Sequence, residues 1–188
     1  MSYNYLDYVC KRFKNASFEN YTVTDKNKEA FDESKKYCEN FEQNLEEGNN
    51  LIICGDVGVG KTHLAYAVKR QLVSQGFEKV VITDMMKLLN EIKATFNNGG
   101  KFDDYSIYQR CLTSDLVILD EIGVQYGTEA ERIMMYELFN KRYEDMKPTI
   151  AMSNLDKKGL NLVLGQRIVD RLCGSKNKFI FIKENSKR

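Results

Sequence analysis

The stretch GDVGVGKTHLA, residues 55–65, brings together glycines, a lysine and a threonine at a spacing that suits phosphate chemistry. Four residues separate Gly55 from Gly60, and Lys61 and Thr62 follow Gly60 directly. Glycines in such a loop let backbone N–H groups converge on a phosphate, the lysine reaches the β- and γ-phosphates, and the hydroxyl completes the coordination of Mg²⁺. The stretch therefore predicts a site for ATP and Mg²⁺. The loop residues that we expect around the nucleotide are Gly55, Gly58, Val59, Gly60, Lys61, Thr62 and His63.

A pair of carboxylates supplies the second half of the expected chemistry. The run DLVILDEIG, residues 115–123, is apolar until it reaches Asp120 and Glu121. At a strand end, Asp120 is placed to hold Mg²⁺ together with Thr62, and Glu121 to polarise the attacking water as general base. Without the glycine loop this pair would be an ordinary strand end. Beside the loop, Glu121 indicates an ATP hydrolase rather than a kinase or a small GTPase.

A polar amide ends another apolar run, TIAMSN, residues 149–154. At the tip of a strand beside the one that ends in Asp120, Asn154 would orient the water against the γ-phosphate. The alternative is that Asn154 is a simple turn residue.

These residues need a scaffold that gathers strand ends, and the hydrophobic pattern supplies one. Short apolar, β-branched runs predict strands, and apolar residues at helical spacing predict helices between them. The expected strands cover residues 49–55, 79–83, 115–123, 149–154 and 178–183, and the expected helices cover 61–75, 84–96 and 128–145, with one or two short helices in 159–172. This alternation predicts an α/β fold with a parallel sheet covered on both faces.

The first part of the chain has a different pattern. Residues 27–48 are highly charged but carry an apolar stripe, which predicts a helix that packs against the edge of the sheet. We therefore expect a single domain in which residues 1–48 form an N-terminal segment and helix on a core formed by residues 49–188.

Length and composition restrict the class of protein. At 188 residues, with 43% hydrophobic and 29% charged residues, the chain is long enough for one folded domain. It has no apolar run of about 18 residues and no signal-peptide core, so we expect a cytoplasmic protein without a membrane partner. Five scattered cysteines without a C-x-x-C pair argue against disulfides and zinc, and His63 is the only histidine.

Charge is unevenly distributed along the chain. The formal net charge is +1, yet residues 156–188 contain nine Lys or Arg against three Asp or Glu. Such asymmetry favours a polyanionic partner, above all a nucleic acid, although a solvated basic face would give the same pattern.

In combination these motifs resemble the AAA+ ATPases, and within them the DnaC/IstB-type group of bacterial helicase loaders. The matching stretches are ASFENY at residues 16–21, GDVGVGKTHLA, DLVILDEIGVQ, GQRIVDRL at residues 165–172, and NSKR at residues 185–188. The resemblance implies a three-layer P-loop NTPase fold with a five-stranded parallel sheet in the order 5-1-4-3-2 and no separate helical lid.

The resemblance also assigns roles to single residues. Asn154 would be the sensor 1 residue, and Phe18 lies in the segment that packs near adenine. Arg171 would be the arginine finger presented to the ATP of a neighbouring subunit, with Arg167 close by, and Arg188 would be the sensor 2 residue. Without the site, Arg167 and Arg171 would be read as surface arginines on a helix.

A DNA contact is expected from the helix over residues 84–96 and the loop after it, which lie where initiators and loaders place the elements that line a central channel. Lys93, Phe96 and Lys101 offer cations near an aromatic ring, as single-strand binding requires. Core packing is the alternative for Phe96.

The resulting hypothesis is an oligomeric ATPase, a spiral or a ring, that loads a DnaB-type replicative helicase onto single-stranded DNA during replication. The alternatives are a regulatory protein that inhibits a host loader or helicase, and an IstB-like transposition helper. Typical loaders carry an N-terminal helicase-binding domain, whereas fewer than twenty residues precede ASFENY. A short natural form or a truncated chain would explain this.

Overall fold

A parallel sheet lies at the centre of the computed structural model, which describes residues 10–97, 106–124, 127–174 and 177–183. Its strands are β1 (Leu51–Gly55), β2 (Val80–Asp84), β3 (Leu116–Ile122), β4 (Thr149–Ser153) and β5 (Lys178–Ile182). They are ordered β2-β3-β4-β1-β5, and every pairing is parallel. Read from the other edge this is 5-1-4-3-2, so the expected sheet order is confirmed.

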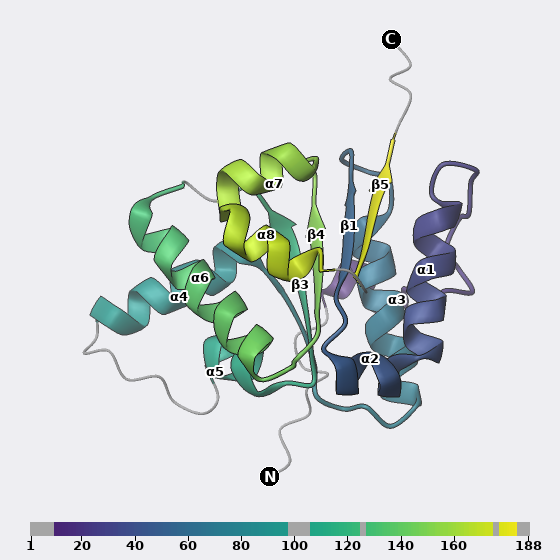
Figure 1. Ribbon diagram of the computed structural model, residues 1–188. Coiled ribbons are helices and arrows are strands. Elements are labelled where there is room, and N and C mark those ends of the chain that lie inside the picture. The colour runs from purple at the N-terminus through teal and green to yellow at the C-terminus, as the bar shows by residue number, and fades with distance from the viewer. Residues whose placement is uncertain (1–9, 98–105, 125–126, 175–176, 184–188) are drawn as a thin grey trace.

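Helices cover both faces of the sheet. The described helices are η1 (Lys11–Phe13), α1 (Lys28–Glu39), α2 (Phe41–Glu47), α3 (Lys61–Ser74), α4 (Met85–Asn97), α5 (Ile107–Thr113), α6 (Glu129–Glu144), α7 (Lys157–Leu164) and α8 (Gln166–Leu172). Figure 1 shows α1, α2 and α3 on one side of the sheet and α4 to α8 on the other. The fold is therefore the three-layer α/β architecture that the sequence predicts.

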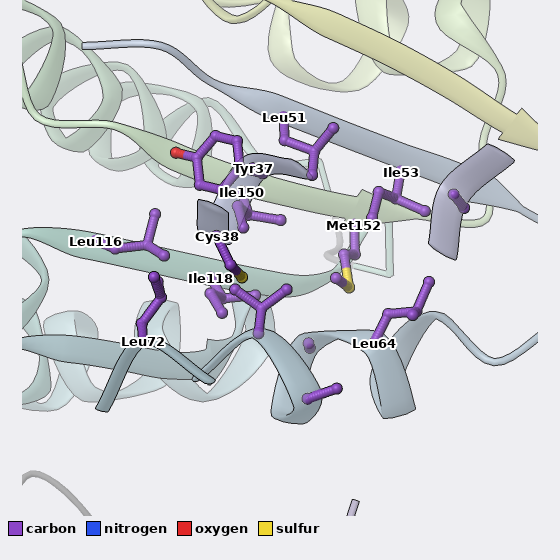
Figure 2. Packing of buried hydrophobic residues seen from close by; sticks show 14 of the residues in the cluster. Tyr37, Cys38, Leu51, Ile53, Leu64, Leu72, Leu116, Ile118, Ile150 and Met152 are labelled. Atoms are coloured by element: carbon purple, nitrogen blue, oxygen red, sulfur yellow. The ribbon is translucent and has the colours of Figure 1, made fainter. Parts of the chain in front are cut away.

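The strands bury side chains on both faces because successive residues point to opposite sides. In β1, Leu51 and Ile53 join the core beneath α1 to α3, whereas Ile52 and Cys54 join the core beneath α4 to α8. Figure 2 shows the first of these cores, in which side chains from α1 and α3 meet those of the sheet. Two-sided burial explains why the strands read as continuous apolar runs.

Residues 27–48 form two helices, α1 and α2, rather than the one expected. The side-chain amide of Asn40 donates to the carbonyl of Lys36 at 2.8 Å, so it takes up a carbonyl at the end of α1. Asparagine competes with the helix backbone in this way, which ends the helix. Helix α1 packs against α3 and the edge strand β5.

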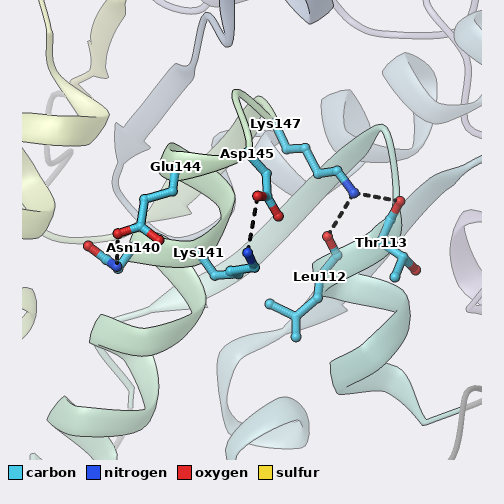
Figure 3. A network of polar contacts seen from close by, with 7 residues as sticks. All are labelled: Leu112, Thr113, Asn140, Lys141, Glu144, Asp145 and Lys147. Atoms are coloured by element: carbon cyan, nitrogen blue, oxygen red, sulfur yellow. Dashed lines mark hydrogen bonds and ion pairs between the residues drawn. The ribbon is translucent and has the colours of Figure 1, made fainter.

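Helix α5 has no counterpart among the expected elements. It is seven residues long, too short for a periodic signal, and it depends on tertiary contacts. Lys147 Nζ donates to the carbonyls of Leu112 and Thr113 at 3.1 and 3.0 Å at its C-terminal end, as Figure 3 shows. Buried Arg142 donates to the carbonyl of Cys111 at 2.5 Å.

The region 159–172 forms two helices, separated by Gly165 at φ 82°.

No helix in the described ranges is long and apolar enough to span a membrane.

Candidate functional site

The glycine loop connects the end of β1 to the start of α3, at the carboxyl edge of the sheet. Its glycines adopt positive φ: 152° at Gly55, 88° at Gly58 and 97° at Gly60. A Cβ on Gly60 would lie 2.6 Å from the hydroxyl oxygen of Tyr21, and one on Gly55 would lie 2.5 Å from the carbonyl oxygen of Ile182. Conformation and close packing both require glycine at these two positions.

Lys61 begins α3 and folds back over the loop. Its ammonium donates to the carbonyls of Gly55 at 2.7 Å and Asp56 at 2.8 Å. Burial lowers the pKa of Lys61, while the carboxylates of Asp120, Asp56 and Glu121 act in the opposite direction. The Lys61 ammonium is therefore held at the loop, next to the N-terminus of α3. The ammonium and this end of the helix both favour a bound anion such as a phosphate.

Thr62 on α3 and Asp120 on β3 meet where the strands of the sheet end. The hydroxyl of Thr62 donates to Oδ2 of Asp120 at 2.7 Å, and Oδ1 of Asp120 accepts the backbone N–H of Glu121 at 2.8 Å. Asp120 is buried. A hydroxyl and a carboxylate are hard oxygen ligands of the kind that Mg²⁺ prefers, so this donor set fits the metal.

Glu121 lies in a β-bulge. Leu119 pairs with Ala151 and Ile122 with Ser153, so β3 has one more residue than β4 over this stretch. Glu121 adopts φ 56° and its side chain is exposed. Bulges re-aim side chains at strand ends, and a positive φ in a non-glycine residue is frequent at functional sites.

Asn154 follows directly on β4 and is exposed. Ser153, which precedes Asn154, pairs with Ile122, which follows Glu121. Glu121 and Asn154, the two residues predicted to direct the water, are therefore each one residue away from this pair. The Ser153 hydroxyl donates to the carbonyl of Ile122 and accepts the N–H of Leu155 at 3.0 Å. These bonds fix the two strand ends relative to each other.

A cavity of about 540 Å³ opens beside the glycine loop. It is lined by the loop itself, by the chain around Tyr21 and by the end of β5; the residues include Asn20, Tyr21, Thr22, Lys26, Asn27, Gly58, Val59, Gly60, His63, Ile182 and Lys183. Tyr21 donates to the carbonyl of Val59 at 3.2 Å, and Nε2 of His63 lies 3.0 Å from both the carbonyl of Ser17 and Oδ1 of Asn20. His63 thus attaches this segment to α3.

Phe18 lies under this segment rather than along the cavity. It is 7% exposed and packs edge to face against Phe31, with ring centroids 5.6 Å apart. Tyr21, three residues later, lines the cavity and was not singled out from the sequence. Phe18 and Tyr21 both lie in the ASFENY stretch, and residue type alone does not tell which of the two aromatic rings faces the loop.

Arg171 lies where the strands of the sheet begin, whereas the loop lies where they end. Its carbonyl accepts the side-chain amide of Asn50, which immediately precedes β1, whereas the loop follows the other end of β1. At a rise of about 3.3 Å per residue, the length of β1 separates the two by roughly 16 Å. Arg167, near the start of α8, is exposed. The structure therefore does not bring Arg171 to the loop of its own chain.

The residues proposed to contact DNA are only partly described. Lys93 forms an ion pair with Glu131 at 2.6 Å, and Glu131 is fully buried and closes the capping box of α6 with Thr128. Burial alone would raise the pKa of Glu131, but hydrogen bonds from Lys93 and the backbone of Thr128 lower it overall. Phe96 is 54% exposed, so it is not a core residue. Lys101 and Arg188 lie outside the described residues.

Comparisons with known proteins agree with this arrangement. The family model described as IstB-like ATP binding protein matches residues 17–188. The replicative helicase loader DnaC of Buchnera aphidicola (subsp. Baizongia pistaciae) is 33% identical over 161 residues, which cover 85% of this chain and 64% of that protein. DnaC of Escherichia coli K12 is 30% identical over 160 residues, or 85% of this chain and 63% of that protein. This chain thus spans less than two thirds of these relatives.

Solved structures show the same fold. A crystal structure of the DnaC helicase loader superposes with a TM-score of 0.81 at 26% identity, covering 93% of this chain and all of that chain. The replication initiator DnaA, bound to AMPPCP and single-stranded DNA, superposes with a TM-score of 0.77 at 23% identity, over 95% of this chain and 52% of that chain.

Proposed function

This chain belongs to the IstB-like ATP binding protein family, and on that premise we propose that it hydrolyses ATP in an oligomer to load a DnaB-type replicative helicase onto single-stranded DNA. The observation that carries the proposal is the meeting of Lys61, Thr62, Asp120 and Glu121 at one sheet edge, joined by the 2.7 Å bond from Thr62 to Asp120. The 30–33% identity to replicative helicase loaders supports the loading role.

Each residue of the site has a distinct part in this proposal. Lys61 and the N–H groups of the glycine loop hold the β- and γ-phosphates, and the cavity beside Tyr21 receives the nucleoside. Thr62 and Asp120 hold Mg²⁺, which when bound neutralises charge on the phosphates. Glu121 takes the proton of the attacking water, and Asn154 orients that water.

The position of Arg171 supports hydrolysis between subunits. An arginine at the far edge of the sheet serves the site of a neighbouring copy, where its guanidinium stabilises charge on the transferring phosphoryl group. A head-to-tail contact of this kind builds a ring or a spiral. Hydrolysis then depends on assembly, which suits a protein that must release its cargo once it is placed.

Steady-state ATP hydrolysis tests the proposal. The wild-type rate is measured with and without single-stranded DNA and with the cognate helicase hexamer, next to Glu121→Gln and Arg171→Ala. We expect DNA or helicase to change the wild-type rate, and both variants to bind ATP while losing about 100-fold or more of hydrolysis. A wild-type rate that is negligible and indifferent to both ligands would contradict the proposal and favour a regulatory protein that binds ATP as a structural ligand. Stimulation by duplex DNA and a transposase would instead favour a transposition helper.

A further inference from the structure

The side chain of Arg171 is held by one stripe of α6. Its Nη1 donates to Oδ1 of Asn140, and its Cζ lies 5.5 Å from the ring centroid of Tyr136 and 5.0 Å from that of Tyr143. Tyr136, Asn140 and Tyr143 are spaced i, i+4 and i+7, so they share one face of α6. Figure 1 shows this helix next to α8, which carries Arg171. We call the three residues on α6 the arginine cradle.

The main chain of Arg171 is fixed as well. Its carbonyl accepts the side-chain amides of Asn50 at 3.3 Å and Asn177 at 3.2 Å. Asn50 also accepts the N–H of Thr149 at 2.8 Å, and its own N–H donates to Asn177 at 2.7 Å. The end of α8 is therefore attached to the starts of β1, β4 and β5, and the guanidinium is positioned relative to the sheet.

The amide of Asn140 has a defined orientation. Its Nδ2 donates to Oε1 of Glu144 at 2.7 Å, which turns Oδ1 towards Arg171; Figure 3 shows the Asn140–Glu144 bond. A carboxylate in the same place would orient the guanidinium and also neutralise it. Among the described residues, no carboxylate pairs with Arg171. The neutral amide and the two ring faces orient the cation and leave its charge for another acceptor.

We propose that the arginine cradle is a positioning device for hydrolysis: Tyr136, Asn140 and Tyr143 hold the Arg171 guanidinium in place to meet the γ-phosphate bound by an adjacent copy of this chain. The inference rests on the proposed function, because it requires Arg171 to act between subunits. An arginine side chain has many rotamers, and fixing it before contact removes the entropy that would otherwise be lost in the transition state. None of the cradle residues lines the cavity beside the glycine loop of its own subunit, and all of them contact Arg171.

The first test separates positioning from folding by mixing subunits. A double variant Asn140→Ala/Tyr143→Leu keeps its own nucleotide site but loses two contacts to Arg171. Glu121→Gln keeps Arg171 and the cradle but has an inactive site. We expect the double variant alone to hydrolyse ATP about 10- to 100-fold more slowly than wild type at saturating ATP, with unchanged ATP affinity.

Mixing the two variants in equal amounts should restore activity. Random assembly places an intact arginine beside an intact site at about one interface in four, so the rate should rise towards about a quarter of wild type. A defect that merely unfolds α6 would not be rescued in this way. Absence of recovery, with each variant folded and oligomeric, would overturn the inference.

Two further variants sharpen the result. Tyr143→Phe keeps the aromatic face and should stay within about twofold of the wild-type rate, because the cation–π contact does not need the hydroxyl. Gln43→Ala removes a similar amide–carboxylate pair on α2, where Gln43 donates to Glu47 at 3.2 Å, and should leave the rate unchanged.

The failure of the cradle is distinguishable from the failure of the proposed function. If Arg171→Ala abolishes hydrolysis and Asn140→Ala/Tyr143→Leu does not reduce it, the cradle is wrong and the arginine finger stands. If Arg171→Ala hydrolyses ATP at the wild-type rate, the finger is wrong and the cradle falls with it.

Discussion

The Thr62 hydroxyl donates to Oδ2 of Asp120 at 2.7 Å, although these residues lie 58 positions apart in the sequence. Thr62 is in the first turn of α3, which follows β1, and Asp120 is near the end of β3, with β4 between the two strands. The parallel order of the strands brings their carboxyl ends to one edge, so the bond joins the phosphate loop to the carboxylate pair. It marks the point where both oxygens would face Mg²⁺.

Thr62→Val should separate the role of the hydroxyl from that of side-chain volume. Valine keeps the shape but removes an oxygen ligand, so we expect hydrolysis to fall about 100-fold and the Mg²⁺ concentration for half-maximal rate to rise. Thr62→Ser keeps the oxygen and should remain within a fewfold of wild type. Titration of the ATPase rate with Mg²⁺ measures both, and equal Mg²⁺ dependence in the two variants would exclude Thr62 as a ligand.

The sequence predicts much of this arrangement because local patterns encode it. The glycine spacing, the two-sided apolar strands and the position of Asp120 at a strand end are all visible in short windows. The strand order came from the resemblance and is confirmed. Contacts between distant segments have no such signal: Tyr21 over Gly60 and the bulge at Glu121 depend on how separate elements meet.

Arg142 is the clearest case of a side chain whose position the local sequence does not predict. A charged residue on an amphipathic helix is expected at the surface, yet Arg142 is 1% exposed. Its guanidinium donates to the carbonyls of Cys111, Ser114 and Pro148 and to the hydroxyl of Thr149. Burial lowers its pKa to about 10. Nothing in the local sequence distinguishes it from the exposed Arg132 on the same helix.

Gly60→Ala should destabilise the protein more than Gly58→Ala. Both glycines have positive φ, which costs an alanine about 1 kcal/mol. Only at Gly60 would the new Cβ also collide with Tyr21, whereas at Gly58 nothing lies within 4 Å. We expect losses in the free energy of unfolding of about 1 kcal/mol for Gly58→Ala and about 2–4 kcal/mol for Gly60→Ala, measured by urea unfolding without nucleotide. Equal losses would contradict the close packing of Tyr21 on the loop.

Lys93→Gln should reduce stability whether or not Lys93 touches DNA. It leaves the buried carboxylate of Glu131 without its cation, which should cost about 1–3 kcal/mol in urea unfolding. The double variant Lys93→Gln/Glu131→Gln removes both charges and should recover most of that loss. Since we expect it to fold and it lacks the cation, this double variant is the one in which to measure single-stranded DNA affinity by fluorescence anisotropy. Unchanged affinity there would remove Lys93 from the proposed DNA surface.

The buried thiols should make the fold sensitive to alkaline pH. Burial raises the pKa of Cys38, Cys54 and Cys111 from 9.0 to about 12 in the folded protein. The stability that these thiols contribute is fully present below pH 9 and is lost as the pH rises towards 12, because the unfolded chain releases its protons first. Above about pH 9 each thiol lowers the free energy of unfolding by up to about 1.4 kcal/mol per pH unit. The three thiols together lower it by up to about 4 kcal/mol per pH unit.

Cys111→Ala tests this alkaline slope. The variant should be less stable because packing is lost, but between about pH 9.5 and 10.5 its free energy of unfolding should fall less steeply than that of wild type, by up to about 1.4 kcal/mol per pH unit. Parallel curves for Cys111→Ala and wild type would contradict the raised pKa, because they would mean that this fully buried thiol of α5 ionises equally easily in the folded and unfolded chains.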